Sequence, residues 1–504
     1  MPPTRRKFIA ATPVLSMLGV ASASVREENA KTGTTDWQLT RVKINEGQYR
    51  TSLIEGYASR QSLFPGEEIS FFVSTKPERK FTIDLYRMGY YEGKGGRHMT
   101  QLGPFSGKTQ EVPEIGDQRI RECQWEETTT FTVPADWPSG VYLGKLTTIS
   151  EGASDPYWQS YIIFVVKSRQ PADVVFQVSD NTWQAYNRWP VNESLYTNPE
   201  GAQAPGVAVS FDRPYGKYVQ IIDNPLSIGS GEFLLWEFPL CYWLEKEGYD
   251  VSYVSNSDLV DGKAIEGAKA FLSVGHDEYW DTKQYETIRT AINKGVSVLW
   301  LCGNSVFIDS PFTPSSSGAA NRIIERRGCY GDLREDETEM YSRILGALTG
   351  TAPDERAIMG VRSVVPFNGG GDWTCQNQNH WIFEGTGMKH GESIPGLVGW
   401  EHHGEPDPGI DGLEILAEGN VWTGGGRQGK YTSVIFPGPK DNIVFNASTV
   451  FWSQDLASPP GHWLPWSHNS RPHGPDPRVQ RMTKNALDRA LGKRKEASMI
   501  QVEM

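Results

Sequence analysis

Cysteine is scarce in this sequence, which has five among 504 residues. An odd number of thiols, without closely spaced pairs, argues against a zinc site and against a small fold held together by disulfides. Cys241 and Cys302 lie in apolar runs, so we predict that they are buried thiols. A disulfide between Cys329 and Cys375 stays open as a hypothesis, because an oxidising compartment would permit it and sequence alone does not set the pairing.

The sequence also lacks an internal apolar run that would cross a bilayer, which takes about 20 residues. The best stretch, 233–244, is interrupted by Glu237 and Pro239. Basic residues are outnumbered, since 49 Lys and Arg stand against 61 Asp and Glu, a formal net charge of −12. Such a surface repels phosphate backbones. We therefore expect neither an integral membrane segment nor a nucleic-acid partner.

The N-terminal residues have the pattern of an export signal. Thr4-Arg5-Arg6-Lys7-Phe8-Ile9 precedes an apolar stretch that ends at Val20, and Ala21-Ser22-Ala23 follows it. A paired arginine, a short apolar stretch and small residues are typical of a twin-arginine signal peptide. We predict that residues 1–23 are removed and that the chain is exported folded, to a periplasmic or secreted location. An ordinary unfolded-chain signal is the alternative.

Residues 38–168 have the pattern of a β-sandwich. Short runs alternate apolar and polar residues, and turn signals such as Pro65-Gly66 and Gly95-Gly96 separate them. Regular short strands with such breaks predict an immunoglobulin-like sandwich with a packing or binding role. The runs are 68–74, 81–86, 128–133, 141–148 and 161–166.

Residues 171–456 have a different pattern, in which apolar strands alternate with helices. The predicted helices cover 233–247, which Gly248 ends, and about 282–294, between Asp281 and Gly295. This alternation predicts a doubly wound parallel sheet of the flavodoxin or glutamine-amidotransferase type. β-rich additions follow over about 361–452, and 457–504 is predicted as a loop and a C-terminal helix. The predicted parallel strands are 174–178, 251–254, 270–274 and 296–301.

Three of these strands end in polar sequence. The run at 270–274 leads into Gly275-His276-Asp277-Glu278, 296–301 leads into Cys302-Gly303-Asn304, and 174–178 leads into 179–187. Ligands of open parallel sheets bind beyond the carboxyl ends of the strands, so these ends predict a binding site. If strand geometry continues, His276 and Glu278 share one face and Asp277 takes the other. An imidazole beside a carboxylate serves as an acid/base pair, or as a proton carrier beside a metal ligand.

Other candidate sites are weaker. Cys302 lacks the preceding glycine of a nucleophile elbow, and no Gly-x-Ser-x-Gly occurs, which argues against a thiol or serine hydrolase. The tandem His402-His403 and three scattered histidines near the C-terminus lack the i, i+4 spacing of a helical metal site. We interpret them as solvated loop residues: His402, His403, His462, His468 and His473.

Several motifs, taken together and in order, resemble the large (beta) subunit of N,N-dimethylformamidase over roughly residues 57–491. They are Tyr86-Arg87-Met88-Gly89-Tyr90-Tyr91, Thr182-Trp183-Gln184-Ala185-Tyr186-Asn187, Ser210-Phe211-Asp212-Arg213-Pro214-Tyr215, Gly275 to Trp280, and Phe445-Asn446-Ala447. That family is similar to an amidase whose single iron is held by two tyrosinates and one glutamate. The resemblance implies one iron per chain, as Fe³⁺, and no nucleotide or organic cofactor.

Carried over by motif, the resemblance implies roles for individual residues. Glu278 is the carboxylate ligand and Tyr186 one phenolate, while Tyr215 is preferred as the second phenolate and Tyr196 is its rival. His276 acts as acid/base. The resemblance also implies that Asn304 orients substrate or water, and that four further residues line the pocket: Asp277, Phe445, Asn446 and Phe451.

These roles are chemically coherent. Hard anionic oxygen ligands favour a hard ion such as ferric iron, and a phenol with a pKa near 10 ligates only where a cation offsets its deprotonation. Three protein ligands leave positions for water and an amide carbonyl. We therefore expect a metal-dependent hydrolase of a linear amide. The family's amidase works with a separate small subunit, so a small subunit and a homo-oligomer are the expected partners. The alternative is a non-catalytic exported protein that binds a carbohydrate or peptide.

Overall fold

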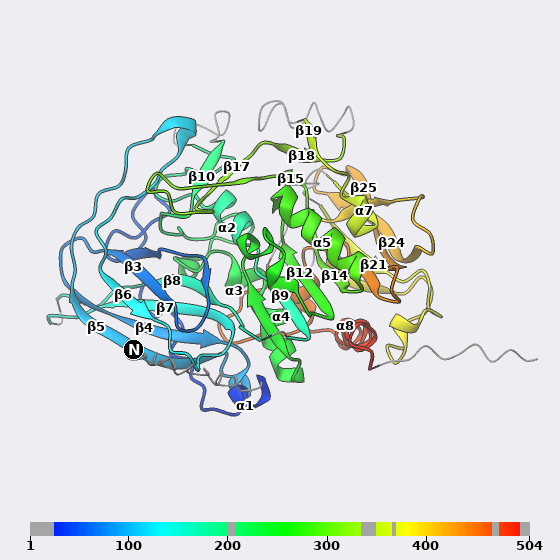
Figure 1. Cartoon of the computed structure of the whole chain (residues 1–504), viewed down its shortest axis with the longest axis horizontal. Coiled ribbons are helices and arrows are strands. Elements are labelled where there is room, and N and C mark those ends of the chain that lie inside the picture. The colour runs from blue at the N-terminus through cyan, green and yellow to red at the C-terminus, as the bar shows by residue number, and fades with distance from the viewer. Residues whose placement is uncertain are drawn as a thin grey trace, which may run out of the picture.

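The computed structural model describes residues 25–152, 154–170, 172–198, 207–333, 349–364, 369–465 and 473–493. The signal peptide expected at 1–23 lies outside these residues. The fold is of mixed α/β class with more strand than helix, which confirms the predicted class in its broad form. A β-rich part forms the left of the molecule in Figure 1, and the α/β part lies beside it.

Two sheets form the N-terminal part. The five-stranded sheet has the order β2 (Ser62–Leu63), β8 (Gln159–Val166), β7 (Gly140–Thr148), β4 (Lys80–Met88) and β5 (Gly96–Ser106). The other sheet has the order β1 (Glu55–Ala58), β3 (Glu68–Ser74) and β6 (Thr129–Thr132). Every second residue of β3 and β4 is buried, and Phe71, Phe81 and Phe164 belong to one apolar cluster contributed by both sheets. This cluster is the core of a two-layer arrangement.

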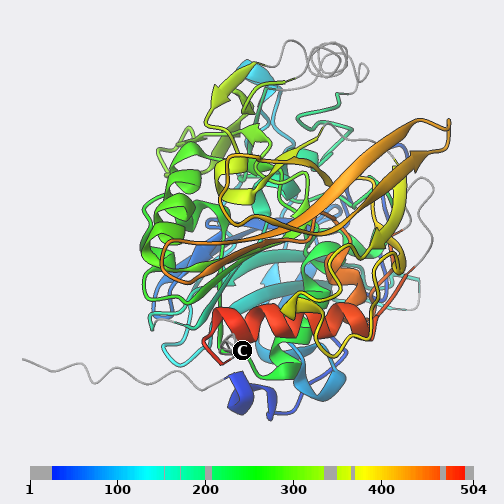
Figure 2. The same cartoon turned by 90° about the vertical axis from the view of Figure 1, so that its right-hand side faces the viewer.

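A nine-stranded sheet forms the centre of the α/β part. Five strands are parallel, in the spatial order β11 (Val251–Val254), β9 (Val174–Gln177), β12 (Ala270–His276), β14 (Ser297–Gly303) and β26 (Ile443–Asn446). The sheet continues antiparallel through β25 (Gln428–Pro437), β24 (Glu414–Thr423), β21 (Gly369–Thr374) and β22 (Ser393–Val398). Figure 2 shows the long β24–β25 hairpin reaching out from the body of the molecule.

Helices cover both faces of the parallel strands. Residues of α4 (Phe238–Glu247) and α8 (Pro477–Ala490) belong to the apolar cluster on one face, and residues of α5 (Thr282–Lys294) belong to the cluster on the other. Asp281 caps α5 by accepting from the Lys283 amide, and Gly295 ends it with φ +104°, as predicted from the sequence.

The helix predicted over 233–247 is in fact two helices. α3 (Phe233–Trp236) ends where Glu237 intervenes, and α4 begins at the next residue. Pro239 has no amide hydrogen, so it cannot donate to the carbonyl of Leu235 four residues earlier. Gln454 Nε2 donates to that carbonyl instead, at 2.8 Å.

Short elements complete the fold. α1 (Val25–Asn29) lies at its N-terminal end, α2 (Asp180–Tyr186) follows β9, and α7 (Arg356–Met359) precedes β20. The remaining strands form three small sheets. They are β10 (Ala208–Ser210), β17 (Ile323–Glu325) and β16 (Phe312–Thr313); β13 (Tyr279–Trp280), β15 (Ile308–Asp309), β18 (Gly328–Tyr330) and β19 (Gly350–Ala352); and β20 (Val361–Ser363) with β23 (His403–Pro406).

A buried ion pair joins the sandwich to the α/β part. Arg87 of β4 donates to both carboxylate oxygens of Glu245 on α4, at 2.7 and 3.0 Å, and both side chains are buried. Asn29 of α1 donates to the same carboxylate at 2.9 Å. A side chain at position 89 would collide with it, since a Cβ on Gly89 would lie 2.2 Å from Glu245 Oε2. The Tyr86–Tyr91 motif therefore has a structural role at this junction.

The cysteine hypothesis is not supported by the structure. Cys329 and Cys375 are both free thiols, and they belong to different apolar clusters, Cys329 with Tyr279 and Cys375 with residues of α8. Cys241 and Cys302 are buried, as predicted.

Candidate functional site

The polar ends of three parallel strands meet at one edge of the central sheet. β9, β12 and β14 are adjacent, and His276 is the last residue of β12. Asn304 follows β14 directly, and Glu278 is held by its backbone amide, which donates to Thr182 Oγ1 of α2 at 3.0 Å. His276, Glu278 and Asn304 are completely buried. The convergence predicted from the sequence therefore occurs.

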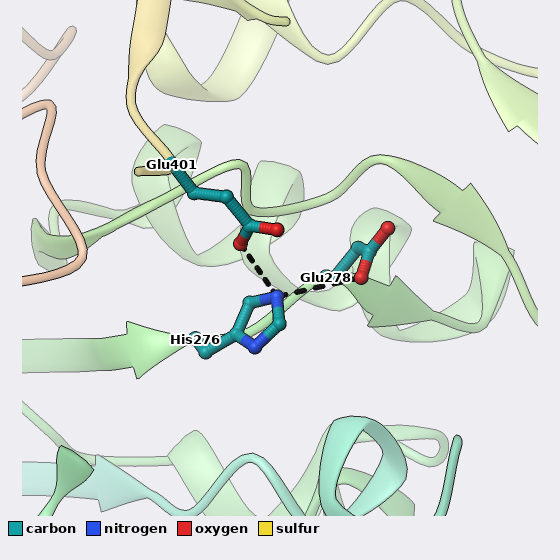
Figure 3. Close-up of side chains that lie close together, drawn as sticks. All are labelled: His276, Glu278 and Glu401. Carbon is teal, nitrogen blue, oxygen red and sulfur yellow. Dashed lines mark ion pairs between the residues drawn. The ribbon is translucent and has the colours of Figure 1, made fainter. Parts of the chain in front are cut away.

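Three carboxylates surround His276. Its Nε2 lies 2.6 Å from Glu401 Oε2 and 3.4 Å from Glu278 Oε2, and its Nδ1 lies 3.8 Å from Glu232 Oε2. Figure 3 shows the imidazole facing Glu401 and Glu278, with Glu401 coming from a separate loop. Neither ring nitrogen of His276 and neither oxygen of Glu401 has an aligned hydrogen bond. One ligand atom from each of His276, Glu278 and Glu401 lies within 4.8 Å of the other two.

Two tyrosines hold the other side of Glu278. The Tyr186 hydroxyl donates to Oε2 at 2.6 Å and the Tyr196 hydroxyl donates to Oε1 at 2.8 Å. Their rings stack with centroids 4.5 Å apart, and the edge of Tyr279 faces both. Two phenol oxygens and one carboxylate thus converge in a buried place.

Tyr215, the preferred second phenolate, lines the same pocket as Tyr186 but is not placed against Glu278. Its ring packs edge-on against Trp183 at 6.3 Å, and among the described contacts no hydrogen bond joins it to Glu278. Tyr196 takes this place because the chain turns back after α2, where the Leu195 amide donates to the Ala185 carbonyl at 2.9 Å. Motif order along the sequence does not reveal such a turn.

Asp277 does not line the site. It points to the opposite side of the strand end, as the alternation of side chains predicts, and accepts from Ser273, Gln177 and Asn256 at 2.7, 2.6 and 3.2 Å. Because three donors occupy its carboxylate, Asp277 has a structural role next to the site. The expectation that Asp277 contributes to the pocket is therefore wrong.

The three other residues that were expected to line the pocket make structural contacts instead. Asn446 supports the fold, since it pairs with His403 Nδ1 at 2.8 Å and donates to the Met359 carbonyl at 3.3 Å. Phe445 packs on Trp452 in the core. Phe451 stacks on Trp236, and Trp236 in turn faces His276. The structure thus places Phe445 and Asn446 outside the site, because β26 turns these side chains into packed layers, and Phe451 behind Trp236.

Asn304 follows β14 at the strand ends and has an unused amide. Its φ of +52° is a left-handed conformation that asparagine tolerates better than most residues. Neither its Nδ2 nor its Oδ1 has a hydrogen-bond partner in the described part of the chain, although both are buried. A buried amide without partners is suited to a ligand.

The interpretation of the outlying histidines as solvated is wrong for four of them. His402, His403, His462 and His473 are buried or nearly so, and burial lowers the pKa of His403 to about 4. Neutral His403 accepts from the Ser305 amide at 3.0 Å and so fixes the residue next to Asn304. His468 lies outside the described residues.

The surroundings and the pKa of Cys302 argue against a role as a nucleophile. It receives a hydrogen bond from Ser273 Oγ at 3.4 Å inside an apolar cluster. Burial raises the pKa of its thiol to about 12, so a thiolate does not form near neutral pH.

Burial and charge set the protonation of the site. Burial alone lowers the pKa of His276, but the neighbouring carboxylates, Glu401 foremost, outweigh it and raise the pKa well above its usual value. Burial raises the pKa of Glu401 to about 7 against the opposing effect of His276. Burial, and then the charge of Glu278, raise the pKa of Tyr186 well above 10, so that Tyr186 keeps its proton unless a cation is near.

Sequence reasoning missed Glu401 and Glu232. Glu401 follows Trp400 in a loop between β22 and β23, far from any parallel strand, and Glu232 lies just before α3. The dense run Trp400-Glu401-His402-His403 was the available signal for Glu401. Glu232 gave no signal beyond a carboxylate beside glycines.

Comparison with known proteins adds the family. A family model described as N,N-dimethylformamidase beta subunit-like, C-terminal, matches residues 82–467, which include every site residue named above. A comparison with curated proteins finds no match. No helix among the described residues has both the length and the apolar character needed to cross a membrane. Since the family model matches well over half of the chain, this chain belongs to the N,N-dimethylformamidase beta-subunit-like family.

Proposed function

We propose that this chain is an iron-dependent hydrolase of linear amides, with the iron held by Tyr186, Tyr196 and Glu278. One observation carries the proposal: the two phenol oxygens lie against the two oxygens of one buried carboxylate, at 2.6 and 2.8 Å. The family of the chain supports an amidohydrolase activity.

The residues present fit a hard, highly charged cation. Two phenols and a carboxylate supply oxygen ligands only, and the raised pKa of Tyr186 means that deprotonation needs a nearby positive charge. Tyr196 is preferred to Tyr215 as the second ligand, because Tyr196 reaches Glu278 and Tyr215 packs on Trp183.

When bound, the iron would polarise the amide carbonyl and lower the pKa of a water molecule. The chain's own residues would do the rest. His276, kept protonated by Glu401, can donate its Nε2 proton to the nitrogen of the departing amine. Glu401 orients the imidazole and balances its charge. Asn304 can donate from Nδ2 to the substrate oxygen, since that group has no partner in the described chain.

Spectroscopy of matched tyrosine variants tests the ligand set. Protein purified with iron should hold about one equivalent and show a visible tyrosinate-to-iron charge-transfer band. Tyr186→Phe and Tyr196→Phe should each weaken or shift the band, and Tyr215→Phe is the matched control that should keep it. A band lost in Tyr215→Phe and kept in Tyr196→Phe would overturn the assignment.

Turnover separates the enzyme from a binding protein. Release of dimethylamine from N,N-dimethylformamide, or of an amine from another linear amide, is expected from the iron-loaded chain. An iron-loaded chain that binds amides, carbohydrates or peptides and turns over none of them would support the alternative.

The finer features of the architecture belong to this proposal. When the five parallel strands are numbered along the chain, their spatial order in the sheet is 2-1-3-4-5. This order supports a flavodoxin-like assignment. The two-layer N-terminal part supports an immunoglobulin-like one. We propose domains at 38–168 and 171–456, a C-terminal segment at 457–504, and export by a twin-arginine signal at 1–23 to the periplasm or beyond. A small partner subunit, suggested by the beta-subunit-like family, is part of the same proposal.

A further inference from the structure

Two pockets meet beside the candidate site. The inner pocket is lined by Tyr186, Glu232, Tyr218 and Gly231, among others, and so borders the candidate iron ligand and a carboxylate beside His276. A second pocket of about 90 Å³ is also lined by Tyr218 and Gly231. The shared residues make the two pockets neighbours.

The second pocket, which we call the apolar pocket, is built mainly from hydrocarbon and aromatic side chains. At its outer end Leu226 and Trp463 are 36% and 43% exposed, unlike most large apolar residues of the chain. Its volume is enough for about six groups of the size of a water molecule. Besides Tyr218, its principal apolar members are Leu39, Ile222, Leu226, Leu234 and Trp463.

The junction of the two pockets carries an unused polar group. The hydroxyl of Tyr218 is buried and makes no aligned hydrogen bond in the described chain, although the backbone of Ile221 lies within reach of it, and the residue as a whole is 7% exposed. The backbone of Tyr218 is fixed, because its amide donates to Ser227 Oγ at 2.7 Å and its carbonyl accepts from Asn224 at 3.0 Å. The ring stands edge-on to Trp236, which faces His276.

Gly231 keeps the junction open. It has φ +57°, and a Cβ there would lie 2.6 Å from the ring of Trp183. A bare backbone therefore forms part of the wall of both pockets.

We propose that the apolar pocket binds an alkyl or aryl substituent of the amide substrate, and that the Tyr218 hydroxyl donates to the polar part of that substrate at the junction. The substrate class is thus amides with an apolar group several carbons long, larger than the methyl groups of N,N-dimethylformamide. This inference rests on the proposed amidase function. It follows from an apolar pocket that shares Tyr218 and Gly231 with the inner pocket, which Tyr186 lines, and from a buried hydroxyl at the shared residues.

A chain-length series tests the pocket without requiring turnover. Methyl ketones from butanone to octan-2-one present a carbonyl and an alkyl chain but no leaving amine. Calorimetric titration of the iron-loaded protein should show affinity rising about fourfold for each of the first few added methylenes. Affinity that does not change with chain length would overturn the proposal.

Three variants test whether the gain in affinity with chain length arises in the apolar pocket. Leu226→Trp fills the outer end of the apolar pocket and should abolish the gain for the longer ketones. Ile149→Trp, a similarly exposed apolar position in the sandwich, is the matched control and should leave the gain unchanged. Tyr218→Phe should weaken every ketone about two- to tenfold with the chain-length gain kept, and its thermal stability should not fall because no partner is lost.

Turnover of N-alkylformamides and N,N-dimethylalkanamides then separates this inference from the proposed function. Rising kcat/KM with chain length in at least one series supports both. Turnover that is independent of chain length, with flat ketone binding, rejects the apolar pocket and keeps the amidase. Chain-dependent ketone binding without turnover of any amide keeps the pocket as a binding site and rejects hydrolysis.

Discussion

Nε2 of His276 lies 2.6 Å from Oε2 of Glu401, and both side chains are buried among aromatic rings. His276 ends a parallel strand, while Glu401 comes from a separate loop, as Figure 3 shows. The two residues are more than a hundred positions apart in the sequence. The pair places a counter-charge beside a buried imidazole, although the contact lacks the alignment of a hydrogen bond. Its consequence is that the pKa of His276 is raised well above that of a free histidine, against the opposing effect of burial.

Glu401→Gln should therefore reduce activity while iron stays bound. Without the Glu401 carboxylate, the largest effect that raises the pKa of His276 is removed, so that pKa falls and less of the imidazole carries the proton it would donate. We expect kcat to fall by about 10²–10⁴. The exposed Glu266→Gln is the control and should keep its rate. Loss of iron in Glu401→Gln would contradict the assignment, because it would make Glu401 a ligand.

Asn304→Gly should separate the function of the amide from its backbone role. Glycine accepts φ +52° without strain, so stability should be kept within about 1 kcal/mol. Removing a donor to the substrate oxygen should lower kcat about 10²–10³-fold. Asn321→Gly, at φ +57° and remote from the site, is the matched control for both thermal unfolding and rate. Equal rates for the two variants would remove Asn304 from the site.

Arg87→Met should destabilise the whole fold. The substitution leaves Glu245 buried without its cation, a loss of about 3–5 kcal/mol in the free energy of unfolding. The control is Arg289→Met, which breaks an exposed pair with Glu286 and should cost less than about 1 kcal/mol. Urea unfolding measures both. Similar losses in the two variants would show that the junction is not a principal source of stability.

Glu237→Gln should flatten the dependence of stability on pH. Burial raises the pKa of Glu237 to about 8, while a glutamate in the unfolded chain has its ordinary pKa of 4.5. Between these values the folded chain binds more protons than the unfolded chain, so stability falls as pH rises, by up to about 1.4 kcal/mol per unit. Thermal melting of the wild type and of Glu237→Gln from pH 5 to 8 measures the difference. A wild type and a variant with parallel pH profiles would contradict this account.

Local patterns predicted much of the fold. The helix cap at Asp281, the glycine at 295 and the short apolar strands are set by neighbouring residues, so the alternation of strand and helix was readable. The break between α3 and α4 was equally local, since Pro239 causes it, yet the apolar character of 233–247 concealed it.

The site was only partly predictable, for a physical reason. His276, Glu278 and Asn304 lie at strand ends, and parallel strands bring their ends together by geometry. Glu401 reaches the site through a loop, and Tyr196 through a turn closed by one backbone hydrogen bond, and neither path follows from periodicity. The tandem His402-His403 was misread for the same reason: the loop is buried by contacts distant in sequence.

The most direct test of the central claim is the position of iron in crystals of the iron-loaded protein, from anomalous scattering at the iron edge. The account predicts one peak per chain at about 2 Å from the Tyr186 and Tyr196 hydroxyl oxygens and from the Glu278 carboxylate, with Tyr215 unbound. A peak bound by His276 and Glu401 without the tyrosines, or no peak beside Glu278, would contradict it.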